Sequence, residues 1–352
     1  MKARSHINVL NTHPKMHAYP RLKSGVMCLP RGLDLYIGLP TYGVLIPAEP
    51  HQHTVRYFNG QHSTAEIASG LGVAIAEIQE LQTLLIHHGM LELLSTQLFT
   101  GNDISQVLIQ ARLHSELDLL THRPGINDGG EQAFSDRESF TILISGENRF
   151  ARNLLAALQG VGFTNTRIIP RAQLTPRIEA SDVCGFSTRT SDIGKSRSEF
   201  AQEIIRNSSI VKSEFLAKAD PDLIISTIPI QWDYVQRWMA EGSEHLHINT
   251  IIGGHLEIGP MVIPGITPCL RCVALTKLDL GIVENDGAVV RGSEYPTAVN
   301  AYLSGLIAMC VSEYVATRNS TLLAASYWLD LLTPLSTPDH RYWDFHPECG
   351  CQ

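Results

Sequence analysis

The chain has 352 residues, 44% of them hydrophobic and 18% charged, which is long and apolar enough for two or three domains with a sizeable core. Its formal net charge of -8 argues against a general binder of nucleic acid or of anionic membranes. The first twenty residues lack the apolar core of a signal peptide, and the apolar stretch "YLSGLIAMCV" is shorter than the roughly 18 residues of a membrane span. We therefore expect a cytoplasmic protein with no membrane or nucleic-acid partner, whose seven cysteines are thiols or metal ligands.

Residues 1–95 are expected to form a first domain. Pro- and Gly-containing turns separate three short extended segments, "GVMCL", "LDLYIG" and "YGVLIP". Three helices follow, at "HTVRYF", at "STAEIASGL", where Ser63 and Glu66 form a capping box, and at "IAEIQELQTLLIHHG", where Gly89 is the C-cap. A small sheet followed by three helices, closed by a strand at "MLELL", predicts a winged-helix-like unit.

This unit is a poor candidate for DNA binding, because its third helix carries two glutamates and no lysine or arginine. Such a unit can instead accept an extended peptide as an added strand, with the third helix as the other wall of the groove. The candidate peptide-binding residues lie on the third strand and the third helix: Tyr42, Val44, Ile46, Ile75, Ile78, Leu81 and Leu85. A purely structural unit is the alternative, since any one of these apolar side chains could belong to its core.

Residues 96–139 are expected to be a connector, with a helix near 103–120 followed by the aperiodic linker "HRPGINDGGEQAFSDRES". From residue 140 to 352, strands such as "FTILISG", "TRIIP" and "PDLIISTI" alternate with helices, which predicts an α/β domain of Rossmann type with a largely parallel sheet. The glycines of a dinucleotide-binding loop are mostly missing, because Gly146 is followed by Glu147, Asn148 and Ala151. We therefore expect the fold without ATP binding.

Two cysteine pairs predict a structural zinc site. Cys269 and Cys272 lie in "PCLRC", and Cys349 and Cys351 lie in the closing "HPECGC". Four thiolates are a preferred set for closed tetrahedral zinc, and His346 is a reserve ligand. The alternatives are two unrelated pairs or a redox couple. The remaining cysteines, Cys28, Cys184 and Cys310, are expected to be inert packing residues.

The segment "EIGPMVIPGITPCLRC", with the distant "HPECGC", resembles the ThiF-like proteins of bacteriocin and thiopeptide biosynthesis, relatives of the ubiquitin-activating and MoeB/ThiF fold. A loose match to the crossover motif of activating enzymes lies in "SDIGKSRSEFA". The resemblance covers nearly the whole chain and implies a PqqD-like module at the N-terminus, consistent with residues 24 to 95.

The resemblance implies a scaffold without catalytic residues. Its N-terminal module would bind the leader of a ribosomally made precursor peptide, and the protein would present it to a YcaO cyclodehydratase, which uses ATP to convert Cys, Ser or Thr residues into azolines. A homodimer is compatible with this interpretation. Two alternatives stay open: an ATP-dependent adenylating enzyme acting on a peptide, and a winged-helix DNA-binding regulator.

Overall fold

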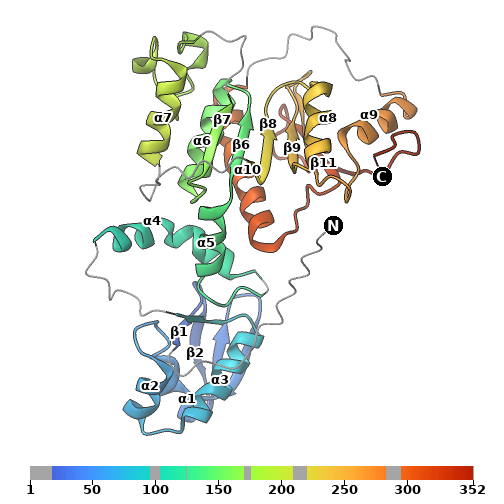
Figure 1. Cartoon of the computed structure of the whole chain (residues 1–352). Coiled ribbons are helices and arrows are strands. Elements are labelled where there is room, and N and C mark those ends of the chain that lie inside the picture. Colours follow the sequence, from blue (N-terminus) through green and yellow to red (C-terminus); the bar gives the residue numbers. More distant parts are fainter. Residues whose placement is uncertain are drawn as a thin grey trace. The chain divides into compact units, whose positions relative to one another are not determined.

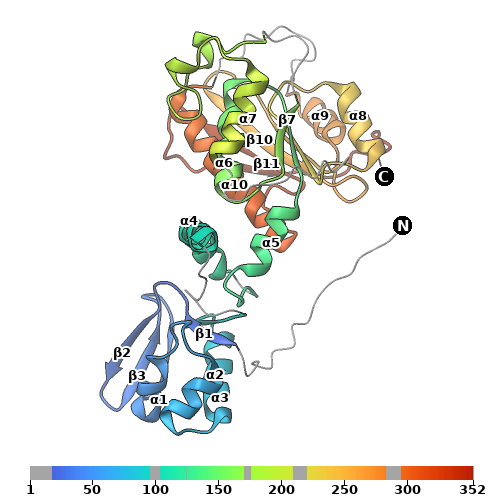
Figure 2. The same ribbon diagram turned by 60° about the vertical axis from the view of Figure 1, so that its left-hand side comes forward.

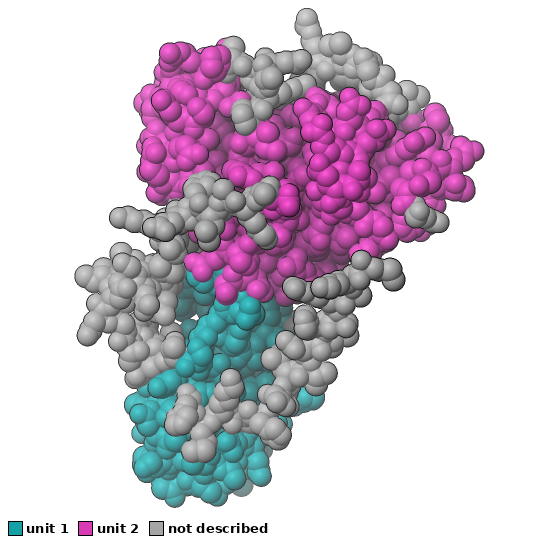
Figure 3. All heavy atoms as spheres, viewed as in Figure 1, with its two compact units in different colours: residues 1–134 teal, residues 135–352 magenta. Residues whose placement is uncertain are grey.

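The computed structural model describes residues 18–95, 104–123, 125–169, 176–208, 220–282 and 295–351. The chain divides into two compact units, residues 1–134 (unit 1) and residues 135–352 (unit 2) (Figure 3). Each unit has its own hydrophobic core. The division falls within the stretch that the sequence predicted to be a connector.

Unit 1 contains the short sheet and the three helices in the predicted order (Figure 1). The antiparallel sheet has the order β2-β3-β4, and a separate antiparallel pair joins β1 to β5. The bounds are β1 Tyr19–Leu22, β2 Met27–Arg31, β3 Asp34–Gly38, β4 Gly43–Pro47, α1 Ala48–Val55, α2 Thr64–Leu71, α3 Ile75–His87 and β5 Leu91–Leu94. The sequence analysis did not predict β1, and it placed the first helix about five residues too late.

Local sequence signals position the second helix. The Ser63 side chain accepts a hydrogen bond from the Glu66 N–H, and the Glu66 carboxylate accepts one from the Ser63 N–H at 2.7 Å, so the predicted capping box is present. The apolar side chains of α2 and α3 then pack with those of β3 and β4 in one core. Ile37 and Leu85 are completely buried at its centre.

The expected linker is partly helical. After α4, Ile104–Thr121, the chain forms α5, Glu131–Ser139, inside the polar segment that the sequence analysis read as aperiodic. Asp128 explains the start of this helix, because its carboxylate accepts hydrogen bonds from the N–H groups of Gly130 and Gln132. A local capping interaction therefore outweighs the weak helical periodicity of the segment.

Unit 2 is built on a seven-stranded sheet of order β12-β11-β10-β9-β8-β6-β7. Figure 2 shows part of this sheet, with β7, β10 and β11 labelled. The strands are β6 Ile142–Ser145, β7 Thr166–Ile169, β8 Leu223–Ser226, β9 His245–Ile248, β10 His255–Val262, β11 Ala325–Asp330 and β12 Asp339–Tyr342. The three pairings among β7, β6, β8 and β9 are parallel. The three pairings that involve β10, β11 and β12 are antiparallel. The expectation of a largely parallel sheet was therefore too broad, because short turns can join antiparallel strands without a crossover helix.

Helices cover both faces of this sheet. Their bounds are α6 Arg149–Gly160, α7 Arg197–Ser208, α8 Trp232–Glu241, α9 Leu270–Asp279 and α10 Thr297–Thr317. Ile142 and Ile144 point toward α6, α7 and α10 in the main core, whereas Leu143 packs with α8 and α9 on the opposite face. This alternation along one strand is the pattern of a sheet that is buried on both sides.

α10 has 21 residues, and its length and mean hydropathy of 1.3 would suffice to cross a membrane. Half of its most apolar window is buried, and its buried side chains, such as Leu303 and Ile307, belong to the main core of unit 2. The helix is thus longer than the apolar stretch considered in the sequence analysis. Its buried side accounts for much of its apolar character.

Candidate functional site

The four predicted zinc ligands come together in unit 2. Their sulfur atoms all lie within 4.8 Å of one another. The Sγ atoms of Cys269 and Cys349 are 3.4 Å apart, as are those of Cys272 and Cys351, and the Cys269 to Cys272 separation is 3.9 Å. A tetrahedral zinc with bonds of about 2.3 Å places its sulfur ligands about 3.8 Å apart. The cluster therefore fits a closed four-thiolate metal site.

The position of this cluster favours a cation. Cys269 is the N-cap of α9, where the helix dipole stabilises thiolates. Burial, and hydrogen bonds with the sulfur atoms of Cys272 and Cys269, raise the pKa of Cys351 to about 11, so this thiol keeps its proton unless a cation takes the place of that proton. The imidazole of the reserve ligand His346 is engaged by other groups, because its Nε2 is 3.0 Å from the carboxylate of Asp279 and its Nδ1 accepts a hydrogen bond from the Glu348 N–H at 3.2 Å. The thiol set is complete without the imidazole.

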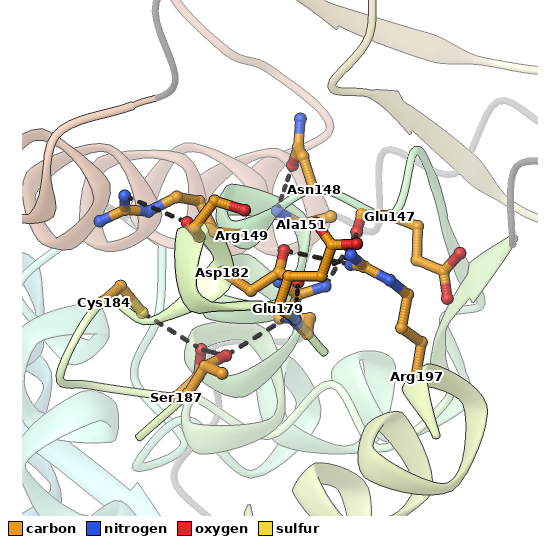
Figure 4. Close-up of polar contacts among 12 residues, drawn as sticks. Glu147, Asn148, Arg149, Ala151, Glu179, Asp182, Cys184, Ser187 and Arg197 are labelled. Atoms are coloured by element: carbon orange, nitrogen blue, oxygen red, sulfur yellow. Dashed lines mark hydrogen bonds and ion pairs between the residues drawn. The ribbon is translucent and has the colours of Figure 1, made fainter. Parts of the chain in front are cut away.

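The loop after β6 is held by short backbone contacts. Gly146 has φ +128°, and a Cβ there would lie 2.4 Å from Thr227 Oγ1, so this turn requires glycine whether or not a phosphate binds. Asn148 caps α6, because its side chain accepts a hydrogen bond from the Ala151 N–H at 2.8 Å (Figure 4). Its amide also donates to the Thr227 carbonyl at 2.9 Å. The Asn148 side chain is therefore already bonded to the Ala151 N–H, a donor that a bound anion could otherwise use.

A buried ion network, missed in the sequence analysis, supports this loop. Asp182 accepts hydrogen bonds from Arg152 at 2.6 Å and from Arg197 at 2.7 and 3.1 Å (Figure 4). Both guanidinium groups also donate to the Glu147 carbonyl. Burial alone would raise the pKa of Asp182, but the Glu179 N–H and the two arginines outweigh it and hold that pKa below its usual range. Arg197 lies in the loosely matched crossover motif, which was the one available signal.

The charges around the loop are mixed. Arg149 donates to Thr297 Oγ1 at 2.9 Å, and its Nε is buried without a hydrogen-bond partner among the described residues. The buried Glu147 brings a carboxylate to the same loop. A cation and the first turn of a helix favour an anionic ligand, and the carboxylate opposes it. The loop can hold polar groups, but it lacks the glycine backbone that cradles a triphosphate.

The seven predicted peptide-binding residues occupy different environments. Tyr42 is exposed, and Val44 and Ile75 are half-buried. The other four are buried in the core of unit 1: Ile46, Ile78, Leu81 and Leu85. Their side chains stabilise the unit in this structure and do not form an open surface. A peptide-binding role for any of the seven stays a prediction.

The third strand of the small sheet nevertheless offers a free edge. β4 pairs with β3 on one side, and no other strand of the described chain pairs with it. Leu45 is 63% exposed there, and it is aligned with Tyr36 on β3, which is aligned in turn with Leu29 on β2. The Tyr36 ring covers Gly43, where a Cβ would lie 2.5 Å from the ring. The outer face of the sheet is thus partly apolar beside an open edge.

Unit 2 is thus a mixed α/β domain, with parallel strands at one end of its sheet and a thiol cluster between α9 and residues 349–351. No protein-family model matches the chain, and the search of curated proteins found no significant match.

Structures of MccB from E. coli share this fold over nearly both full chains. MccB with AMPCPP and MccA has a TM-score of 0.63 and 13% identity, and MccB with ATP has a TM-score of 0.63 and 12% identity. In both comparisons 94% of this chain and 99% of MccB are covered. The heterocyclase TruD has a TM-score of 0.58 and 12% identity over 95% of this chain and 42% of TruD. At these identities the similarity establishes the fold alone.

Proposed function

We propose that this protein binds the leader of a ribosomally synthesised precursor peptide and presents it to a YcaO-type cyclodehydratase that forms azolines. The observation that carries the proposal is the combination of a small sheet with a free edge and a ThiF-like unit in one chain. MccB has the same fold over 99% of its length and has been solved with the peptide MccA. Tethering the leader would raise the effective concentration of the attached core at the partner enzyme.

The similarity to TruD supports the choice of partner. This chain matches 42% of that heterocyclase, so the larger enzyme contains a part with this fold together with additional sequence. We propose that the present chain provides the leader-binding part as a separate polypeptide. The catalytic part would then be the YcaO protein, in the cytoplasm.

An adenylating enzyme that acts on a peptide is the second candidate. It is favoured by the structures of MccB with ATP and AMPCPP, so the expectation that ATP does not bind here has no support from these neighbours. Arg149 and the first turn of α6 offer donors to an anion, whereas Glu147 and the capping side chain of Asn148 disfavour one. An adenylation site would need other groups to hold magnesium and triphosphate.

The leader experiment uses the full chain and the labelled leader of a candidate precursor peptide. Fluorescence anisotropy with the labelled leader should show saturable binding, and a scrambled leader of the same composition is the control. Pyrophosphate exchange with ATP and the complete precursor separates the two candidates. Robust exchange that depends on the precursor would favour the adenylating enzyme over the scaffold. Absence of affinity for the leader would exclude the scaffold.

We infer that the thiol cluster binds one zinc ion with a structural role. The sulfur separations fit tetrahedral coordination, and the set leaves no ligand position for water, as expected in a closed site. Zinc would fasten the end of the chain to α9. Its contribution would be to folding and not to a reaction.

A further inference from the structure

A cavity of about 750 Å³ lies between α6, α7 and α10 in unit 2, closed on one side by the turn at Thr190–Asp192. Its size is in the range of ligand-binding pockets. The four cysteines of the metal-type cluster are not among its lining residues, and neither are the loop residues Gly146 and Glu147. The cavity is therefore distinct from the thiol cluster and from the loop after β6.

Two buried side chains in the cavity wall each have one polar atom without a hydrogen-bond partner among the described residues. Asn153 on α6 is 5% exposed, and its Oδ1 accepts hydrogen bonds from the Ser187 N–H at 3.2 Å and the Cys184 thiol at 3.2 Å. These bonds fix the amide, and its Nδ2 is left without a partner. Ser304 on α10 is also 5% exposed, and its Oγ has no partner. A buried polar atom without a hydrogen-bond partner is costly unless a ligand or a water molecule satisfies it.

The charges at this cavity balance. Lys195 Nζ lies 2.9 Å from both Asp192 and Glu203, and Arg189 is the other cation in the lining. Two cations therefore face two carboxylates. A phosphate or another strongly charged ligand gains little from such a rim and would lose its hydration on entry. The cavity suits an uncharged ligand.

The small side chains in the walls favour an extended peptide over a helical one as the ligand. Ala156 and Ala157 on α6 face Ala301 and Gly305 on α10 as parts of the lining, so a ligand backbone can approach closely. A helix satisfies its own N–H and C=O groups and would leave Asn153 and Ser304 unpaired. An extended peptide carries free carbonyl and amide groups for both. We propose that this cavity binds an uncharged, extended peptide segment with small side chains, which, resting on the proposed function, would be part of the core of the precursor.

The test measures binding by calorimetry to the full chain. The probe is an N-acetylated, C-amidated twelve-residue peptide of Gly, Ser and Thr, compared with one in which four positions are Asp. Saturable binding at one site is expected for the neutral peptide, with at least roughly tenfold weaker binding of the acidic one because its carboxylates would be desolvated. Absence of saturable binding by the neutral peptide overturns the proposal, and so does equal affinity for both peptides.

Two variants localise the binding. Ser304→Ala should weaken it roughly fivefold, yet raise or preserve the melting temperature, because an unpaired buried hydroxyl is removed. Ser312→Ala on the same helix is the matched control, since the Ser312 hydroxyl donates to the Ala308 carbonyl at 2.7 Å. That control should leave binding unchanged. A loss of stability in Ser304→Ala with unchanged affinity would assign the hydroxyl a structural role and contradict the site.

Gly305→Trp should block the cavity without disturbing the fold, since a Cβ there meets no atom within 4 Å. Gly160→Trp, at the end of α6, is equally unobstructed and lies outside the lining. Peptide binding should be lost in the first variant and kept in the second, while leader anisotropy is unchanged in both. Unchanged peptide binding in Gly305→Trp overturns the proposal. A dimer that becomes a monomer in that variant would show that a second copy fills the cavity, and would also overturn it.

Discussion

His247 illustrates how a single buried residue can determine the acid sensitivity of unit 2. It lies on β9, is only 2% exposed, and its Nε2 is 3.0 Å from Asn249 Oδ1. The Asn249 amide donates to Glu257, which forms a buried ion pair of 2.7 Å with Lys277 on α9. Burial lowers the pKa of His247 to about 4, and the charge of Lys277 and the neighbouring His245 act in the same direction. The imidazole is therefore neutral in the folded protein at physiological pH.

We predict that unit 2 loses stability as the pH falls from about 6.5 to about 4. The unfolded imidazole binds a proton near pH 6.5, whereas the folded one binds it near pH 4, so protons favour unfolding in this interval. A difference of 2.5 pKa units at about 1.36 kcal/mol each gives about 3 kcal/mol. Urea unfolding of wild type and His247→Gln between pH 4 and 8 measures it. His255→Gln, at an exposed position of β10, is the control, and parallel curves for wild type and His247→Gln would contradict the assignment.

At the scale of the element, the register of the β3–β4 hairpin determines which main-chain groups of β4 face its open edge. The Leu39 N–H donates to the Tyr42 carbonyl at 2.8 Å and closes the turn. Bonded and non-bonded pairs alternate along an antiparallel ladder, so the pair Ile37 and Val44 is bonded, whereas the main chain of Leu45 points to the free side. An added peptide strand would therefore bond to Leu45.

Leu45→Pro should weaken leader binding about tenfold or more while the unit stays folded. Proline removes the outward N–H but no bond of the β3–β4 ladder, and proline is tolerated on edge strands. Leu45→Ala keeps the N–H and should lose less than about threefold in affinity if main-chain bonding dominates. Anisotropy with the labelled leader, together with circular dichroism to check folding, compares them. Equal leader affinity in wild type and Leu45→Pro would show that the leader does not bind at this edge.

Local signals explain which features could be predicted from the sequence. Ser63 and Glu66 are three residues apart, and the thiols occur in two short pairs, so each pattern is visible without knowledge of the fold. The contact of Arg152 with Asp182 joins residues 30 positions apart, and neither sequence neighbourhood marks it. Burial of Leu85 instead of exposure in a groove likewise depends on how three helices pack. Most of what could not be predicted is thus contact between residues far apart in the chain, although the local Asp128 interaction that starts α5 was also overlooked.

At the scale of the whole molecule, the two units divide the proposed work between them. The edge of β4 in unit 1 would hold a leader, and unit 2 would contribute the cavity and the surface for the enzyme. Residues 349 and 351 follow the last strand of unit 2. Their contact with Cys269 and Cys272 joins positions about eighty residues apart. The stability of unit 2 should therefore depend on this contact.

We predict that the double variant Cys349→Ser and Cys351→Ser loses its zinc and lowers the free energy of unfolding of unit 2 by about 3–5 kcal/mol. Metal binding in a closed site stabilises the folded state only, so loss of two ligands removes that contribution and also frees the chain end. Elemental analysis should give about one zinc per wild-type chain and almost none in the variant. Cys28→Ser, at an exposed position of β2, should keep the metal and the stability. Leader affinity, which depends on unit 1, should be the same in all three proteins, and full retention of zinc by the double variant would exclude the four-thiolate site.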